Sequence, residues 1–552
     1  MKQTVIEAKA LSVAFEQSDF LLRPMNLTLQ AGEILAVIGE SGSGKSTLLK
    51  ALTGLSDRDA KVSGEIHVVG IDMLGSTEET LRKHRFQDFS IVFQNSKEYF
   101  NPSLSMREIL YEILRKQLSG EALPARAKEL MQSVGLEEDV LDQYPRELSG
   151  GMVQKFQIAC AIALHPGLIL LDEPTSSLDA ASRSEFIALI SQIRRSADTA
   201  IVVVTHDLAL ARDLADKILV MYMGMVCETG PVKAVLNQPR HPYTRALIHS
   251  AVELNLYKDI WGIREAEEGQ VPTGCPFSSR CTQCIELCGK GIPPLVRTED
   301  GREIACARGG IVHVMRCEHI GKAYGKKQVL KDCAVDIYGG EIVSVVGRSG
   351  SRKTTLCNIM AGFLKKDEGT VTFHEEVADY SKAYRRMGGL QFVMQDHSDS
   401  LDQRISVYQA IDEPLYLNVD HEPHTEQVRH ALSAVGLETD DAFLQRKIGT
   451  LSGGQRQRVA IARGLVTEPS MLIADEPTSM LDGSSKANLL RLLKGIQSEN
   501  GFSMLIVTHD LASALKISDR IYLLKDGQAV PVPRDIEPEE LEKLMYDTAA
   551  RG

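Results

Sequence analysis

One long segment occurs twice in the amino-acid sequence, and this duplication constrains the fold more than any other feature. The string GESGSGKST at 39–47 recurs as GRSGSRKTT at 347–355, 308 residues later. Three more strings recur 303 residues later. LSGG at 148–151 recurs unchanged, LLDEPTSSLD at 170–179 recurs as IADEPTSMLD, and VVTHDLA at 203–209 recurs as IVTHDLA. Repeats that keep their order with so little drift indicate one duplicated domain with small differences in its loops.

The domain boundaries are predicted from where the repeats stop. The first copy is expected over 1–235 and the second over 311–530, followed by a short tail at 531–552. The segment at 236–310 has no second copy and is richer in proline and cysteine, which indicates a small appended module rather than a flexible linker.

Each copy is predicted to be an α/β domain. Short apolar runs with β-branched residues lie at 33–39, 168–172 and 200–206, the pattern of parallel strands that are buried on both faces. Helical stretches separate them, and Ser105 with Glu108 forms a capping-box pattern before one helix. We expect a mainly parallel sheet in each copy, with an inserted helical subdomain that in the first copy covers most of 94–144.

Composition excludes several classes of protein. The 552 residues carry 62 Lys and Arg against 74 Asp and Glu, a net charge of −12 that disfavours a basic nucleic-acid-binding surface. No uncharged apolar stretch approaches the roughly 18 residues of a membrane span, and the first residues lack a secretory pattern. Ten cysteines is modest usage, so we expect a cytosolic chain with reduced thiols.

Both copies carry a phosphate-binding loop. Gly39, Gly44, Lys45 and Ser46 have the spacing at which backbone N–H groups surround phosphate oxygens at the start of a helix. Lys45 is expected to reach the β- and γ-phosphates of a nucleotide, and the hydroxyl of Ser46 to ligate Mg²⁺. The candidate nucleotide-binding residues of the first loop are Gly39, Glu40, Ser41, Gly42, Ser43, Gly44, Lys45, Ser46 and Thr47. Those of the second loop are Gly347, Ser349, Gly350, Ser351, Arg352, Lys353, Thr354 and Thr355.

An acidic pair ends a later apolar strand in each copy. Asp172 is placed to hold the Mg²⁺ shell, and Glu173 to polarise an attacking water as a general base. Asp475 and Glu476 repeat the pair, and Thr354 is the second candidate hydroxyl ligand of Mg²⁺. These residues predict nucleotide hydrolysis.

The motifs together resemble the ATP-binding cassette superfamily. The resemblance is carried by LSGGM at 148–152 and LSGGQ at 451–455, with Gln94, Gln395, His206 and His509. It implies that the two copies pair head to tail within the chain, each presenting its Ser-Gly-Gly to the γ-phosphate held by the other copy. The residues so implied are Ser149, Gly150, Gly151, Ser452, Gly453, Gly454 and Gln455.

The same resemblance implies roles for single residues. His206 and His509 would contact the γ-phosphate, and Gln94 and Gln395 would ligate Mg²⁺ or water. Phe15 and Tyr324 lie where such cassettes stack an aromatic ring on adenine. The alternative role of these two rings is packing in the hydrophobic core.

The two ATP sites are not expected to be equal. Arg352 replaces the last glycine of the second loop, and a Cβ there costs roughly 1–2 kcal/mol if φ is positive. We expect fast hydrolysis at the Lys45 site and impaired turnover at the Lys353 site. The alternative is that Arg352 is tolerated.

The segment at 236–310 resembles the C-terminal region of ATPases that serve oligopeptide, dipeptide and nickel importers. HPYTRAL at 241–247 and VPTGCPFSSRC at 271–281 carry the resemblance. Its cysteine positions are matched by Cys275, Cys281, Cys288 and Cys306. The resemblance favours a [4Fe–4S] cluster, with zinc or no metal as alternatives. The second copy lacks this tail and ends in PEELEKLMYDTAARG at 538–552.

The expected function is therefore the ATP-hydrolysing subunit of an importer for peptides, nickel or a related small solute, using ATP and Mg²⁺. Such a subunit works with two integral membrane permease subunits and an extracytoplasmic substrate-binding protein, at the cytoplasmic face of the cell membrane and without nucleic acid. The alternative is a soluble twin-cassette ATPase that activates or remodels a protein partner.

Overall fold

The computed structural model describes residues 3–15, 21–94, 99–175, 180–259, 262–264, 273–384, 387–394, 401–418, 422–479, 481–533 and 536–546. The chain divides into two compact units. Unit 1 comprises Met1–Leu254, Gly269–Ser279 and Glu286–Gly310, and unit 2 comprises Asn255–Glu268, Arg280–Ile285 and Ile311–Gly552. The segment at 236–310 is thus shared between the two units.

The main sheet of unit 1 has the strand order β11-β12-β10-β9-β3-β8-β7-β6. Neighbouring strands from β6 to β9 run parallel, and β10 pairs antiparallel with β9. The strands are β3 (Ile34–Ile38), β6 (Phe89–Val92), β7 (Leu168–Asp172), β8 (Ala200–Thr205), β9 (Lys217–Tyr222), β10 (Met225–Pro231), β11 (Val296–Arg297) and β12 (Glu303–Ile304). Every residue of β3, β7 and β8 is buried, so the predicted central strands are confirmed.

A second, antiparallel sheet of unit 1 has the order β2-β1-β4-β5. Its strands are β1 (Thr4–Phe15), β2 (Leu21–Gln30), β4 (Ala60–Val68) and β5 (Ile71–Asp72). Helix α1 (Lys45–Thr53) buries Leu48, Leu49 and Leu52 in one core cluster with residues of both sheets, including Val13 and Leu35. This packing fixes the helix that opens directly after the first phosphate loop.

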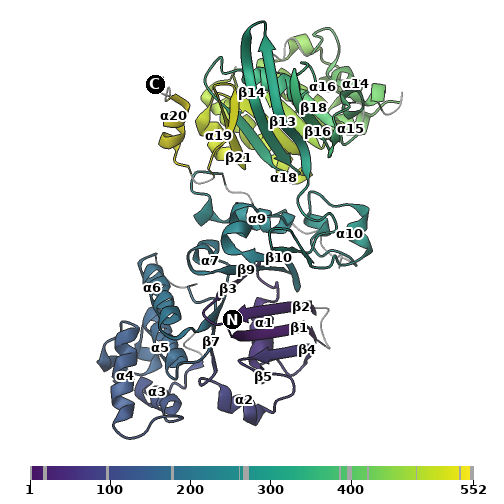
Figure 1. Ribbon diagram of the computed structural model, residues 1–552. Coiled ribbons are helices and arrows are strands. Elements are labelled where there is room, and N and C mark those ends of the chain that lie inside the picture. Colours follow the sequence, from purple (N-terminus) through teal and green to yellow (C-terminus); the bar gives the residue numbers. More distant parts are fainter. Residues whose placement is uncertain are drawn as a thin grey trace. The chain divides into compact units, whose positions relative to one another are not determined.

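Helices α3, α4 and α5 gather beside the main sheet and form the helical subdomain of unit 1 (Figure 1). At the start of α3, the hydroxyl of Ser105 accepts from the N–H of Glu108 while the Glu108 carboxylate accepts from Ser105, which confirms the predicted capping box. The helices between the strands are α2 (Glu78–His84), α3 (Met106–Leu114), α4 (Ala122–Ser133), η2 (Glu138–Asp142), η3 (Pro145–Glu147), α5 (Gly150–Ile162), α6 (Ala180–Ala197) and α7 (Leu208–Leu214).

The residues after β10 build onto the same sheet. The helical elements there are α8 (Val232–Asn237), α9 (Pro242–Ser250), η4 (Val252–Leu254), η5 (Ser278–Arg280) and α10 (Glu286–Lys290). Strand β12 pairs antiparallel with β10, and β11 with β12. This region therefore extends the sheet of unit 1 by two short strands.

Unit 2 repeats this architecture, with sheets in the orders β14-β13-β16-β17 and β18-β19-β20-β15-β21-β22. Its strands are β13 (His313–Tyr324), β14 (Lys327–Tyr338), β15 (Ile342–Val346), β16 (Glu368–Phe373), β17 (Glu376–Val377), β18 (Leu390–Val393), β19 (Met471–Asp475), β20 (Ser503–Thr508), β21 (Arg520–Lys525) and β22 (Gln528–Pro531). Its helices are α11 (Lys353–Met360), α12 (Tyr380–Ala383), α14 (Val407–Asn418), α15 (Thr425–Ala434), α16 (Asp441–Leu444), η6 (Ile448–Thr450), α17 (Gly453–Leu465), α18 (Gly483–Asn500), α19 (Leu511–Ile517) and α20 (Pro538–Tyr546). Two tandem α/β domains with mainly parallel core sheets and helical subdomains are thus confirmed, whereas a distinct Cys-rich module stays a prediction.

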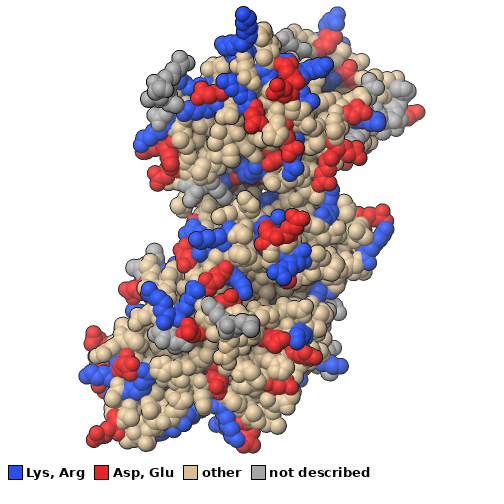
Figure 2. Space-filling model, in the orientation of Figure 1, with Lys and Arg blue, Asp and Glu red and all other residues tan. Residues whose placement is uncertain are grey.

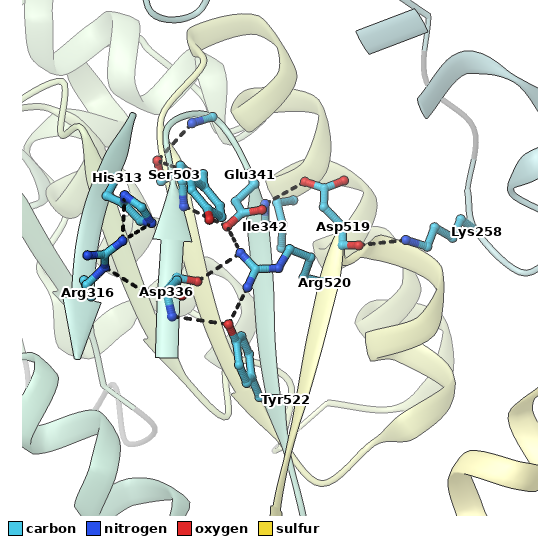
Figure 3. Close-up of polar contacts among 12 residues, drawn as sticks. Lys258, His313, Arg316, Asp336, Glu341, Ile342, Ser503, Asp519, Arg520 and Tyr522 are labelled. Atoms are coloured by element: carbon cyan, nitrogen blue, oxygen red, sulfur yellow. Dashed lines mark hydrogen bonds and ion pairs between the residues drawn. The ribbon is translucent and has the colours of Figure 1, made fainter. Parts of the chain in front are cut away.

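A polar network ties the first residues of β15 and β21 together, where both strands begin (Figure 3). The Arg520 guanidinium pairs with the buried Glu341 at 3.1 Å and lies 5.0 and 5.3 Å from the ring centroids of Tyr338 and Tyr522. Lys258 donates to the carbonyl of Asp519 at 2.9 Å. The stretch that follows η4 is therefore anchored on unit 2.

Charges of both signs are interspersed over the face shown in Figure 2, and the basic residues there form no continuous patch. Among the helices of the described residues, none combines the length and the apolar composition that a membrane crossing requires. The expectation that the permease subunits are separate chains rests on the resemblance.

Candidate functional site

The first phosphate loop lies between β3 and α1, and its glycines are needed for steric reasons. A Cβ on Gly39 would stand 2.2 Å from the carbonyl oxygen of Met221. Gly44 caps α1 with φ 99° and ψ 7°, a left-handed conformation that disfavours residues with a Cβ. Helix α1 then begins at Lys45, as the spacing of the motif predicts.

Lys45 lies across its own loop. Its ammonium donates to the carbonyl oxygens of Gly39 and Glu40, both at 2.9 Å. Burial lowers the pKa of Lys45, while the carboxylates of Glu173 and Asp172 oppose that shift. The ammonium therefore lies between the loop and the acidic pair, where a nucleotide's terminal phosphates are expected.

The predicted magnesium ligands of the first site are in contact. The hydroxyl of Ser46 donates to Oδ1 of Asp172 at 3.4 Å, and burial raises the pKa of Asp172. A hydroxyl and a carboxylate at the edge of a phosphate loop are the oxygen donors that Mg²⁺ takes alongside nucleotide phosphates. The donor set therefore fits a magnesium ion.

Glu173 and His206 form the next layer of the site. Nδ1 of His206 lies 2.7 Å from Oε2 of Glu173, whose side chain is largely buried whereas the imidazole is exposed. Glu173 has a φ of 49°, and its N–H donates to the carbonyl of Val204 in β8. The backbone thus turns sharply at the predicted general base and holds its carboxylate beside the histidine.

The second phosphate loop has the same construction with one difference. Lys353 donates to the carbonyls of Gly347 and Arg348 at 2.9 and 3.3 Å, and burial lowers its pKa. Arg352 caps α11 with φ 77° and ψ 25°, the left-handed conformation that Gly44 adopts in unit 1. The conformation that would strain an arginine is therefore present.

The acidic pair of unit 2 is also in place. Burial, reinforced by the charge of Glu476, raises the pKa of Asp475 to about 6. Oδ1 of Asp475 is buried and accepts no hydrogen bond within the described part of the chain, as expected of an atom whose partner is a metal. Nδ1 of His509 lies 3.3 Å from Oε1 of Glu476, which has a φ of 44°. The Thr354 hydroxyl opposes that rise in the pKa of Asp475, so the second site also offers a hydroxyl and a carboxylate as ligands for Mg²⁺.

The remaining candidate nucleotide-binding residues of both loops lie between these anchors or in the first turns of α1 and α11, and their contact with nucleotide stays a prediction. They are Ser41, Gly42, Ser43, Thr47, Ser349, Gly350, Ser351 and Thr355. Buried Ser43 lies within 3.5 Å of the Lys45 ammonium.

The Ser-Gly-Gly motifs each begin a helix. Ser149 caps α5 by accepting from the N–H of Met152, and Ser452 caps α17 in a reciprocal capping box with Gln455. The glycines Gly150, Gly453 and Gly454 are exposed, and Gly151 is half-buried. Each motif lies in a different unit from the loop it is expected to complete, so head-to-tail pairing remains a prediction.

The structure differs in how it treats the remaining predicted residues, which are the two glutamines and the two aromatic rings. Gln94 is exposed just after β6, and Gln395 lies outside the described residues. Phe15 is partly buried against the core of unit 1, which agrees with the core-packing alternative. Tyr324 is 53% exposed at the end of β13 with the ammonium of Lys322 5.8 Å from its ring, so it remains available for stacking.

The predicted iron–sulfur ligands do not form a metal site. Cys275, Cys288 and Cys306 belong to unit 1 and Cys281 to unit 2. Within the ranges that the structure describes, no three His, Cys, Asp or Glu side chains are arranged to hold a metal ion. The iron–sulfur prediction, which rested on matching cysteine positions, is therefore not supported.

Sequence reasoning missed one contact of the first loop. The hydroxyl of Tyr243 in α9 accepts a hydrogen bond from the backbone N–H of Glu40 at 2.9 Å. The repeat spacing contained a signal for it, because Tyr546 follows Tyr243 by 303 residues, the offset that also separates the two LSGG strings.

Two family models and several curated relatives match this chain. A family model described as ABC transporter matches residues 22–176 and 330–479, and one described as the C-terminal region of the oligopeptide/dipeptide transporter matches 227–288. The glutathione import ATP-binding proteins GsiA of Escherichia coli (strain K12) and Shigella sonnei (strain Ss046) are each 30% identical, over 96% of this chain and 86% of theirs.

Among solved structures, a dimeric ATP-binding cassette in a post-hydrolysis state with ADP and phosphate is 29% identical over 41% of this chain and 98% of its own, with a TM-score of 0.38. The family matches cover both phosphate loops, both Ser-Gly-Gly motifs and both acidic pairs. The chain belongs to the ABC transporter family and carries two of its ATPase cassettes.

Proposed function

We propose that this chain is the ATP-hydrolysing subunit of an importer for a peptide-like small solute, acting on two separate membrane permease subunits from the cytoplasmic side. An extracytoplasmic binding protein would deliver the solute. Glutathione or a short peptide is favoured over nickel because the similar relatives are glutathione import proteins.

Two matches carry this proposal. The similarity to GsiA extends over 96% of the chain, and the oligopeptide/dipeptide C-terminal region lies between the two cassettes. A twin-cassette ATPase that acts on a soluble partner has no need of that region, and the comparisons do not favour this alternative.

The chain's own residues suggest how each site works. Lys45 and the loop N–H groups bind the phosphates, while Ser46 and Asp172 would hold Mg²⁺, which neutralises phosphate charge when bound. Glu173 orients and deprotonates a water, and His206 keeps the carboxylate in place and contacts the γ-phosphate. Lys353, Thr354, Asp475, Glu476 and His509 would do the same in unit 2.

Closure would follow from pairing of the cassettes. The exposed helix starts at Ser149 and Ser452 supply N–H groups that favour a terminal phosphate held by the other cassette. Binding of ATP would then hold the two units together and hydrolysis would release them, which is the motion that the permeases convert into transport.

The test is reconstitution with membrane partners. The tagged chain is captured from a membrane fraction, and uptake of labelled glutathione and tripeptides is measured in cells that carry either the unmodified chain or Glu173→Gln. Recovery with two multi-spanning proteins and uptake that the variant abolishes are expected. A chain that hydrolyses ATP fully but captures no membrane protein would contradict the proposal.

A further inference from the structure

The tail helix α9 reaches the first phosphate loop through Tyr243. This side chain is fully buried, and its ring packs against Tyr222 of β9 and Phe277 with centroids 4.7 and 5.3 Å away. Its hydroxyl accepts the hydrogen bond from the N–H of Glu40. Since the ring is enclosed, the hydroxyl is a fixed point against which the loop is held.

The two residues before Tyr243 fix the start of the helix. Nδ1 of His241 accepts from the N–H of Tyr243 at 3.1 Å, and Pro242 occupies the first turn of α9. The N–H of His241 in turn donates to the buried carboxylate of Glu228 at 2.9 Å. Histidine, proline and tyrosine in this order therefore set the direction in which the tyrosine side chain leaves the helix.

Glu40 is held through both of its backbone polar groups. Its N–H donates to Tyr243, and its carbonyl accepts from the ammonium of Lys45. Further along the loop, the carbonyl of Ser43 accepts from the N–H of Gly224 at 3.0 Å. Tyr243 thus restrains the residue whose carbonyl positions the phosphate-binding lysine.

The second loop is held differently. Tyr546 in α20 occupies the matching position of the repeat, and its ring centroid lies 5.4 Å from the guanidinium of Arg348, the residue that replaces Glu40. Tyr546 is 52% exposed, whereas Tyr243 is fully buried. The contact in unit 2 is therefore made by the ring and in unit 1 by the hydroxyl.

We infer that Tyr243 is a positioning residue for the first ATP site: its hydroxyl pre-orders the Lys45 loop, and helix α9 thereby sets the nucleotide affinity of that cassette. A loop held in its binding conformation loses less freedom on binding ATP, so affinity falls when the hydroxyl is removed. The inference rests on the proposed function only in taking ATP as the ligand.

The test compares Tyr243→Phe with Tyr546→Phe in the full chain. Both carry Lys353→Ala, so that titration with a fluorescent ATP analogue and Mg²⁺ reports the first loop. Tyr243→Phe keeps the packed ring and removes the hydroxyl that accepts from Glu40. Relative to the Lys353→Ala parent, this is expected to weaken binding about fivefold and to raise the KM for ATP equally, with kcat within about twofold. Tyr546→Phe is expected to leave both values unchanged.

Three results would overturn the inference. Unchanged or tighter binding by Tyr243→Phe would mean that the hydroxyl does not order the loop. A lower melting temperature with unchanged affinity would mean that the hydroxyl only stabilises the unit. An equal loss in Tyr546→Phe would mean that the effect is not specific to the first site. Failure of the unmodified chain to bind ATP would instead contradict the proposed function.

Discussion

The two ATP sites are built on the same backbone but differ at one residue of the loop. In unit 1, Gly44 takes the left-handed conformation that precedes the helix, and in unit 2 Arg352 takes it with φ 77°. Left-handed backbone costs a residue with a Cβ roughly 1–2 kcal/mol, so the second loop stores strain that the first does not. Similar architecture therefore does not imply similar turnover.

The first prediction tests this asymmetry most directly. Glu173→Gln removes the general base of the unstrained site and is expected to lower total ATPase about a hundredfold, whereas Glu476→Gln is expected to leave most of it. Steady-state phosphate release by the two purified variants is the measurement. Equal losses in the two variants would contradict a dominant first site.

The tails of the two units are expected to differ in how their stability depends on pH. Burial lowers the pKa of His241 to about 4, well below the ordinary value of roughly 6.5. Because the folded state holds this imidazole neutral, its contribution is present above the ordinary pKa and is lost as the pH falls toward 4. We expect unit 1 to lose about 2 kcal/mol between pH 7 and pH 5, measured by denaturant unfolding.

The matched control for this prediction is His241→Asn. Asparagine caps a helix as well and does not titrate, so its stability curve is expected to lack this pH dependence. The matching position of the second tail is Leu544, which contributes no comparable loss in unit 2. An unchanged slope in His241→Asn would assign the acid sensitivity to other groups.

The two main sheets also differ where their interior strands begin. Arg520 in unit 2 pairs with Glu341, whose side chain is 3% exposed, and stacks on two tyrosines. At the same place in unit 1, Lys217 pairs with the more exposed Glu33 at 3.1 Å. Arg520→Ala is expected to cost unit 2 about 1.5 kcal/mol because the buried Glu341 carboxylate loses its guanidinium partner, and Lys217→Ala is expected to cost unit 1 less. The measurement is the melting temperature of each variant. Equal losses of stability would mean that the burial of Glu341 does not strengthen its pairing with Arg520.

Much of this molecule could be predicted from local patterns. The runs that form β3, β7 and β8, the capping box at Ser105 and the helix start at Lys45 each depend on residues close in sequence. The bond from Glu40 to Tyr243 joins residues 203 positions apart, so no local pattern contains it. The cysteine positions matched a family pattern, but their spacing does not determine whether the side chains meet in space.

The smallest expected effect is that of Arg352→Gly. This variant distinguishes backbone strain in the second loop from obstruction of the second ATP site by the arginine side chain. Glycine adopts positive φ without a Cβ penalty, so unit 2 is expected to gain about 1 kcal/mol in stability and total ATPase to rise a few fold. Gly44→Arg, the reverse exchange, is expected to lower turnover at the first site. If Arg352→Gly stabilises unit 2 without raising ATPase, strain is not what limits the second site. If ATPase rises without a gain in stability, the arginine side chain itself obstructs turnover.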